Sequence, residues 1–124
     1  MARSTHRTGI AGCLLLAAIA LPDSSQDAEK TLSGTYEFAG KEAIDPPPDQ
    51  PRDTHLQLFL AGNAAKDLYD ALKVKAVPDE CIGGDAKSKF QGAIACTMHA
   101  GGKEYECSFA VDLNNQKLDS VYAC

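Results

Sequence analysis

The sequence predicts a small α+β domain in which one helix packs on a mostly antiparallel sheet of four or five strands. One segment has apolar residues at helical spacing, and the C-terminal third alternates apolar and polar residues between turn signals. A third observation is the presence of four cysteines after an export-type N-terminus, which predicts two disulfides. We expect the sheet to end in a three-stranded C-terminal meander.

Residues 1–28 have the organisation of a secretory signal peptide, which we expect to be cleaved near residue 20 or 28. Basic residues precede the apolar run Ile10–Leu21, which is shorter than the roughly 20 residues that span a bilayer. The IAGC sequence that ends at Cys13 has the residue types of a lipid-attachment site, but most of the apolar run follows this cysteine. We therefore expect a periplasmic or secreted protein with no lipid at Cys13 and no membrane span.

Residues 29–124 have the length of one domain with a modest core. The chain carries 17 acidic and 12 basic residues, for a net charge of −5, and the charges are scattered. It offers no cationic surface for phosphate groups, so nucleic acid is not an expected partner. The stretch 31–38 predicts a first strand, and the proline-rich stretch 45–53 predicts a stiff connecting loop.

The middle of the chain predicts a second strand and then the helix. His55–Leu60 has a leucine at every second position, which is typical of a strand with one buried face. Asn63 follows as a candidate helix N-cap. Apolar residues then recur at helical spacing, so we expect a helix from Asn63 to about Lys75, ended by Val77-Pro78.

The C-terminal third predicts a hairpin. In Lys103–Asp112 large apolar residues or cysteine recur at every second position from Tyr105 to Val111, and Gly101-Gly102 before it suits a two-residue turn. This turn sets Cys96 opposite Cys107 at a hydrogen-bonded pair of positions. In this register the inward-facing residues of both strands meet, so the alternation and the turn agree.

A second turn, at Asn114-Asn115, predicts the last strand of the meander. It sets Leu118 opposite Val111 and extends the strand to the C-terminus, where Cys124 lies diagonal to Cys107.

Cys81, Cys96, Cys107 and Cys124 are expected to form the two disulfides. In the meander, Cys96 and Cys124 lie on the two strands that flank the central strand, too far apart to be joined. We favour Cys81 with Cys96 and Cys107 with Cys124. The alternative pairing joins Cys81 to Cys124 and Cys96 to Cys107.

The meander face without cysteines carries small residues with polar and charged residues at its rim, including Asp112 and Asp119. Either the N-terminal strand or an oligomer neighbour covers this face, or it binds a partner. The candidate binding residues on and around it are Ala95, Thr97, His99, Glu104, Glu106, Ser108 and Ala110.

The sequence predicts no catalytic site, metal site or cofactor. An even number of cysteines leaves no free thiol after residue 28, and no cysteine or histidine pair has the close spacing typical of zinc ligands. His99 lies opposite Glu104 at a predicted non-hydrogen-bonded position. This pair is either a pH-sensitive contact or a solvated hairpin tip.

Short motifs resemble small exported bacterial proteins of uncharacterised families that contain two disulfides. The resemblance covers about the last 70 residues and implies a periplasmic or secreted two-disulfide domain, with no catalytic residue carried over. Periplasmic lysozyme inhibitors are similar in size, export and disulfides only. The motifs are LYDALKV (68–74), IACTMH (94–99), YECSFAVDL (105–113) and the terminal Cys124.

We therefore expect a binding or accessory module, inhibitor-like in character, that contacts a protein partner in the cell envelope. One alternative is a small hydrolase or thiol-dependent enzyme that uses His99 with Glu104 or with a cysteine. The other is a purely structural envelope protein, which would form a stable homo-oligomer.

Overall fold

The computed structural model describes residues 29–41, 47–122 and 124. The predictions of a signal peptide, its cleavage and the absence of a lipid at Cys13 concern residues that lie outside the described ones, as does part of the proline-rich loop. In the part of the chain that is described, no helix is long and apolar enough to cross a membrane.

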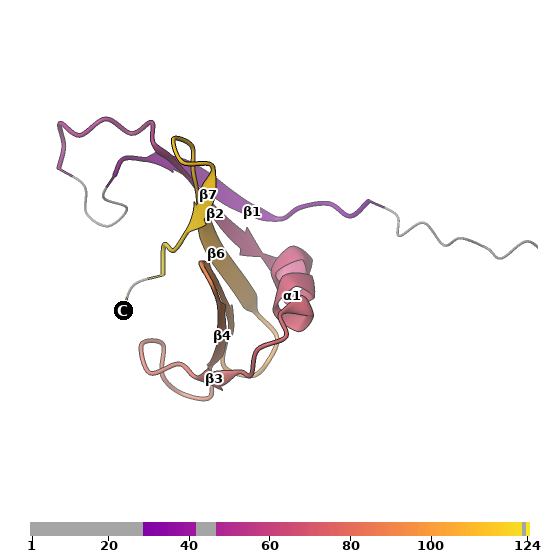
Figure 1. Ribbon diagram of the computed structural model, residues 1–124. Coiled ribbons are helices and arrows are strands. Elements are labelled where there is room, and N and C mark those ends of the chain that lie inside the picture. The colour runs from indigo at the N-terminus through magenta and orange to yellow at the C-terminus, as the bar shows by residue number, and fades with distance from the viewer. Residues whose placement is uncertain (1–28, 42–46, 123) are drawn as a thin grey trace, which may run out of the picture.

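Among the described residues, one helix packs on an antiparallel sheet of seven strands, which confirms the predicted α+β class (Figure 1). The strand order is β1-β2-β6-β5-β4-β3, and β7 pairs with β6. The described elements, in chain order, are β1 (Gly34–Ala39), β2 (His55–Ala61), α1 (Gly62–Ala71), β3 (Val77–Pro78), β4 (Lys87–Gln91), β5 (Ile94–Met98), β6 (Tyr105–Asp112) and β7 (Lys117–Asp119).

Strands β3 and β4 are the ones that the sequence did not predict. β4 reads KSKFQ, and its fully buried residue is Ser88, which hydrogen-bonds to Asp79 and Thr97. A buried serine that is satisfied by side chains distant in sequence gives no apolar alternation. The sheet therefore has more strands than the four or five expected.

Helix α1 covers one end of one face of the sheet. Its buried residues Ala65 and Tyr69, with Leu72 just beyond it, form the core with Cys96 and Cys107. A helix of ten residues is only about 15 Å long, so it does not reach the far end of this face. There the sheet keeps apolar side chains at the surface, among them Tyr36, Phe38 and Leu118.

The start of the helix differs from the prediction. Helix α1 begins at Gly62, directly after β2, and Ala61 occupies the N-cap position without a side-chain hydrogen bond. Asn63 is therefore inside the first turn instead of capping it. The backbone N–H of Ala61 still donates to the carbonyl of Ser33, which ties the junction between strand and helix to the chain before β1.

The helix also ends earlier than predicted, at Ala71 instead of near Lys75. The ammonium group of Lys89 on β4 donates to the carbonyl oxygens of Tyr69 and Leu72, at 2.9 and 3.1 Å. These bonds satisfy carbonyl groups that a helix end leaves without partners. The cation comes from a strand and not from the helix, so the helix sequence itself contains no signal for this ending.

The β5–β6 hairpin has the predicted register, but its turn is longer than predicted. The N–H of His99 donates to the carbonyl of Glu104, and that of Gly102 donates to the carbonyl of His99. The hairpin therefore closes at positions 99 and 104, which shifts the hydrogen-bonded positions by one residue. Cys96 and Cys107 consequently occupy a non-hydrogen-bonded pair with their Cα atoms 4.0 Å apart.

Strand β7 has the predicted register, with Leu118 opposite Val111, but it is short. β2 pairs with β6 along one edge, from Glu106 to Asp112, so β5 and β7 share the other edge. β7 therefore ends at Asp119, where β5 takes over that edge. The last residues leave the sheet, and Cys124 does not lie beside Cys107.

The favoured disulfide pairing is wrong, and the alternative pairing is the observed one. Cys96 is joined to Cys107, and Cys81 is joined to Cys124 with Cα atoms 5.8 Å apart. Two assumptions caused the error. A two-residue turn placed Cys96 and Cys107 at a hydrogen-bonded pair, which is unfavourable for a disulfide between them. A last strand that continued to the C-terminus placed Cys124 beside Cys107.

Candidate functional site

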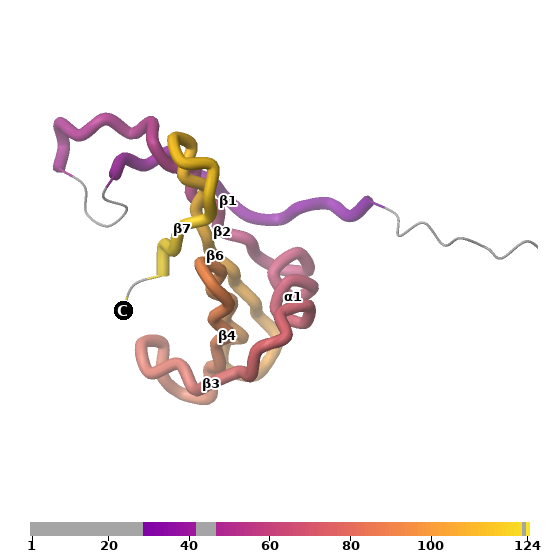
Figure 2. Tube along the Cα trace, in the orientation of Figure 1, coloured from indigo at the N-terminus to yellow at the C-terminus, as the bar shows by residue number. Residues whose placement is uncertain are grey.

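The sheet face opposite α1 is partly covered by two segments, the loop between β3 and β4 and the C-terminal segment after β7 (Figures 1 and 2). The disulfide Cys81–Cys124 joins these two segments. β1 does not cover this face, because it extends the sheet at its edge by pairing with β2. The cover that was expected from the N-terminal strand is therefore supplied by these two other segments of the same chain.

A cavity of about 340 Å³ opens beside this cover. Its floor consists of short side chains on neighbouring strands: Ser108 lies opposite Ala95 in the register, and Thr97 lies one row further along. Short side chains leave room above the sheet. The described residues around the cavity are Gly34, Thr35, Phe59, Leu60, Ala61, Ile82, Ala95, Thr97, Glu106, Cys107, Ser108 and Tyr122.

Three larger side chains form the walls of the cavity. Phe59 comes from β2, Ile82 follows Cys81 directly, and Tyr122 lies two residues before Cys124. The disulfide thus positions two walls at once. The ring of Tyr122 also packs edge-on against the ring of Phe90, with 5.0 Å between their centroids.

The buried carboxylate of Asp79 fixes the loop that carries Ile82. One oxygen accepts the backbone N–H groups of Cys81 and Ile82, and the other accepts the hydroxyl groups of Ser88 and Tyr122. The hydrogen bond from Ser88 is the main cause that lowers the pKa of Asp79. Burial, followed by the contact with Asp79, raises the pKa of Tyr122. The carboxylate therefore joins the loop, the sheet and the C-terminal segment.

The structure separates the candidate binding residues into three groups. Ala95, Thr97, Glu106 and Ser108 line the cavity, and Ala110 is only 1% exposed in the sheet beyond it. The other candidates, His99 and Glu104, lie at the hairpin around a separate depression that they share with Glu106.

The predicted side-chain contact between His99 and Glu104 is wrong, because the hydrogen-bonded positions of the β5–β6 hairpin are shifted by one residue. The two residues are joined through their backbones, whereas the imidazole Nε2 of His99 lies 2.9 Å from the carboxylate of Glu106. Glu106 is mostly exposed at this contact. The contact is therefore partly solvated.

The wall residues Phe59, Ile82 and Tyr122 were missed from the sequence. A large apolar residue next to a cysteine, as Ile82 is next to Cys81, could have drawn attention to the loop, because a disulfide holds its neighbours in place. Nothing local shows that Phe59 faces the small residues of β6. That contact depends on the pairing of β2 with β6.

A second polar cluster lies on the same sheet face at the far end from the hairpin. His55, Asp112 and Asp119 approach one another there. Hydrogen bonds to Asp112, chiefly from the side chain of Asn115, lower the pKa of this carboxyl. The two acids were expected only at the rim of the small-residue face, and His55 was not expected to contact either of them.

Comparisons of the chain with protein-family models, curated proteins and solved structures gave no match. The geometry of the cavity therefore carries the functional argument. All four cysteines among the described residues are joined in disulfides, and the described cavity lining contains no histidine. What this arrangement offers is a shaped apolar recess beside one carboxylate, Glu106.

Proposed function

We propose that the protein is an exported binding module that takes one apolar side chain of a protein partner into this cavity. The observation that carries the proposal is Ile82, which is 45% exposed and yet held beside a floor of small side chains by the adjacent disulfide. Two disulfides in a small domain fit an extracellular or periplasmic location. We infer that the protein works there after cleavage of its signal peptide near residue 20 or 28.

The size and rigidity of the cavity support this function. A volume of about 340 Å³ lies at the lower end of the range for ligand pockets, so it suits one anchoring side chain better than a large cofactor. Anchors of this kind supply much of the binding energy of protein interfaces. Walls fixed by Cys81–Cys124 and Asp79 lose little conformational freedom on binding, which favours affinity.

The enzymatic alternative has less support from the described residues. It requires His99 beside Glu104 or beside a free cysteine. The ring of His99 instead contacts Glu106, and each cysteine between Cys81 and Cys124 is in a disulfide. These contacts favour binding over thiol chemistry.

The test compares two substitutions of exposed apolar residues, Ile82→Arg and Leu118→Arg. The side chains are 45% and 48% exposed, but only Ile82 lines the cavity, whereas Leu118 lies on the opposite face of the sheet. Replacing the floor residue Ala95 would be less informative, because it is only 4% exposed and arginine there would disturb the sheet.

Indole serves as the apolar probe, and binding is measured by titration in ¹H–¹⁵N NMR spectra. We expect the amide signals of Ala95, Thr97 and Ser108 to shift on titration in the wild type and in Leu118→Arg. In Ile82→Arg, the affinity for indole obtained from these shifts should be at least tenfold lower. If no cavity signal moves in the wild type, or if Ile82→Arg binds indole as the wild type does, the proposal is wrong.

A further inference from the structure

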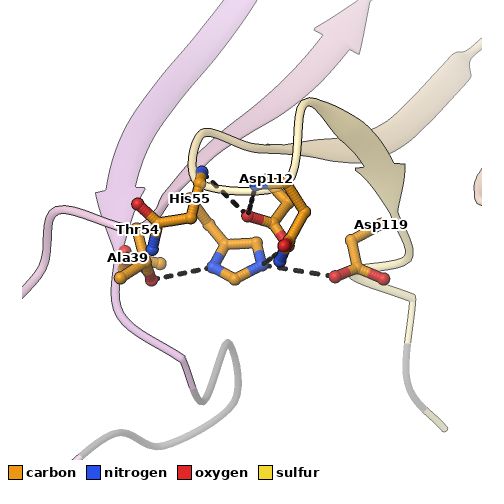
Figure 3. A network of polar contacts seen from close by, with 7 residues as sticks. Ala39, Thr54, His55, Asp112 and Asp119 are labelled. Atoms are coloured by element: carbon orange, nitrogen blue, oxygen red, sulfur yellow. Dashed lines mark hydrogen bonds and ion pairs between the residues drawn. The ribbon is translucent and has the colours of Figure 1, made fainter.

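The pairing of three strands brings His55, Asp112 and Asp119 together. His55 begins β2 and lies opposite Asp112 at the end of β6, while Asp119 ends β7, which returns along the other edge of β6. Figure 3 shows the imidazole ring between Thr54 on one side and Asp119 on the other. None of the residues of this cluster lines the cavity described above, so its role is separate from the proposed function.

The distances in the cluster suit the ligands of a metal ion. Nε2 of His55 lies 3.2 Å from Oδ2 of Asp119 and 4.0 Å from Oδ2 of Asp112, and the three candidate ligand atoms lie within 4.8 Å of one another. Bonds of about 2.0–2.2 Å to a tetrahedral zinc ion place its nitrogen and oxygen ligands roughly 3.3 Å apart. The carboxylate of Asp112 accepts hydrogen bonds from Asn114 and Asn115, so a bound ion would have to draw its Oδ2 closer to the ring to complete a set of three ligands.

The contacts of Thr54 leave the correct ring nitrogen available. The hydroxyl of Thr54 lies 3.4 Å from the carbonyl oxygen of Ala39 and 2.9 Å from Nδ1 of His55, so it can donate to the carbonyl and accept from Nδ1. A neutral ring with its proton on Nδ1 presents a lone pair at Nε2, toward the two carboxylates. Second-shell bonds of this kind orient histidines that bind metals.

The charges favour a cation at this point. Two carboxylates and Nε2 converge here, and a bound cation would offset the negative charge of the two acids. Lys41 also lines this depression and opposes part of the negative charge, which leaves it net negative. His55 and Asp112 are 12% and 7% exposed, but Asp119 is 46% exposed, so an ion can enter from its side.

We propose that His55, Asp112 and Asp119 bind one Zn²⁺ ion per chain. An imidazole nitrogen with two carboxylate oxygens, and room for water at the remaining position, matches the ligands that zinc accepts. Ca²⁺ and Mg²⁺ prefer larger sets of oxygen ligands, so they bind this cluster more weakly.

The test is calorimetric titration of the untagged, oxidised full chain with zinc chloride at neutral pH. We expect one ion per chain, and affinities at least tenfold lower for Asp119→Asn and His55→Gln. Because Asp119 is half exposed, Asp119→Asn should keep the melting temperature of the wild type, so its loss of binding cannot be ascribed to unfolding. His99→Gln is the matched control, since the ring of His99 pairs with the carboxylate of Glu106 and lies outside the cluster.

Four results would overturn the assignment. The first is that the wild type takes up no zinc at millimolar concentration. The second is that Asp119→Asn and His55→Gln bind zinc as the wild type does, and the third is that His99→Gln abolishes binding. Binding of calcium chloride as tight as that of zinc would also contradict it, because the imidazole would then have no role.

Discussion

Asp79 shows how much of this structure depends on one carboxylate that no local pattern marks. It accepts two backbone and two hydroxyl hydrogen bonds and thereby orders both cavity walls beside the disulfide. The chain of donors continues, since Ser88 gives its proton to Asp79 and therefore accepts one from Thr97 on the cavity floor. A change at Asp79 should consequently affect both the stability and the shape of the cavity.

Asp79→Asn should lower the free energy of unfolding at neutral pH by about 1.5–3 kcal/mol, because it replaces bonds to a charged acceptor and turns an amide N–H toward two donors. The pKa of Asp79 is lower in the folded chain than its ordinary value of 3.8, so the folded state binds fewer protons. The stabilisation is therefore present above about pH 4 and disappears as the pH falls through the lowered pKa.

Urea denaturation of both proteins at neutral pH and near pH 3 measures this effect. The difference between wild type and variant should shrink in acid. Glu80→Gln, at the exposed neighbouring carboxylate, should stay within about 0.5 kcal/mol of the wild type. A difference for Asp79→Asn that is the same at both pH values would exclude the ionised carboxylate as its cause.

Among the secondary-structure elements, helix α1 is the clearest case of an end imposed from outside. Its last turn contains no basic residue, and Lys89 on β4 satisfies its carbonyl groups instead. The ammonium group also lies 4.6 Å from the centre of the Tyr69 ring. The sequence predicted the helix, but it did not predict β4, the strand whose Lys89 satisfies the last carbonyl groups of the helix.

Lys89→Met keeps the apolar stem of the side chain and removes its donors. We expect a loss of about 1–2 kcal/mol in the free energy of unfolding, since the helix end loses both a cation and two hydrogen bonds. Lys87→Met, two residues earlier on the same strand and exposed, should have almost no effect. Equal losses in chemical denaturation of the two variants would show that Lys89 does not stabilise the helix end.

Considered as a whole, the molecule was predictable where contacts are local. Alternation and turn residues predicted the β5–β6 register and the start of β7, because a hairpin joins neighbours in sequence. The placement of β2 beside β6 was not predictable in this way. This pairing decides which edge of β6 is left for β7. It thereby decides where β7 ends and which cysteine Cys124 can reach.

The same limit explains what was missed in the functional sites. The floor residues Ala95 and Ser108 followed from one hairpin, whereas the wall residue Ile82 depends on the disulfide between positions 81 and 124. His55 reaches Asp119 only because three strands pair, and the two residues are 64 positions apart in the sequence. Patterns read over short windows cannot detect such pairs.

If the disulfide between the loop and the C-terminal segment builds the binding cavity, removing it should abolish binding before it unfolds the sheet. Cys81→Ser with Cys124→Ser should cost about 2–4 kcal/mol, while the bond between Cys96 and Cys107 keeps the core joined. The decisive measurement is the indole titration of this double variant by NMR. Without indole, we predict that β5 and β6 keep the dispersed signals of a folded sheet. With indole, we predict at least tenfold weaker binding than in the wild type. Binding as tight as in the wild type, at the same amide signals, would contradict the proposed role of the cavity.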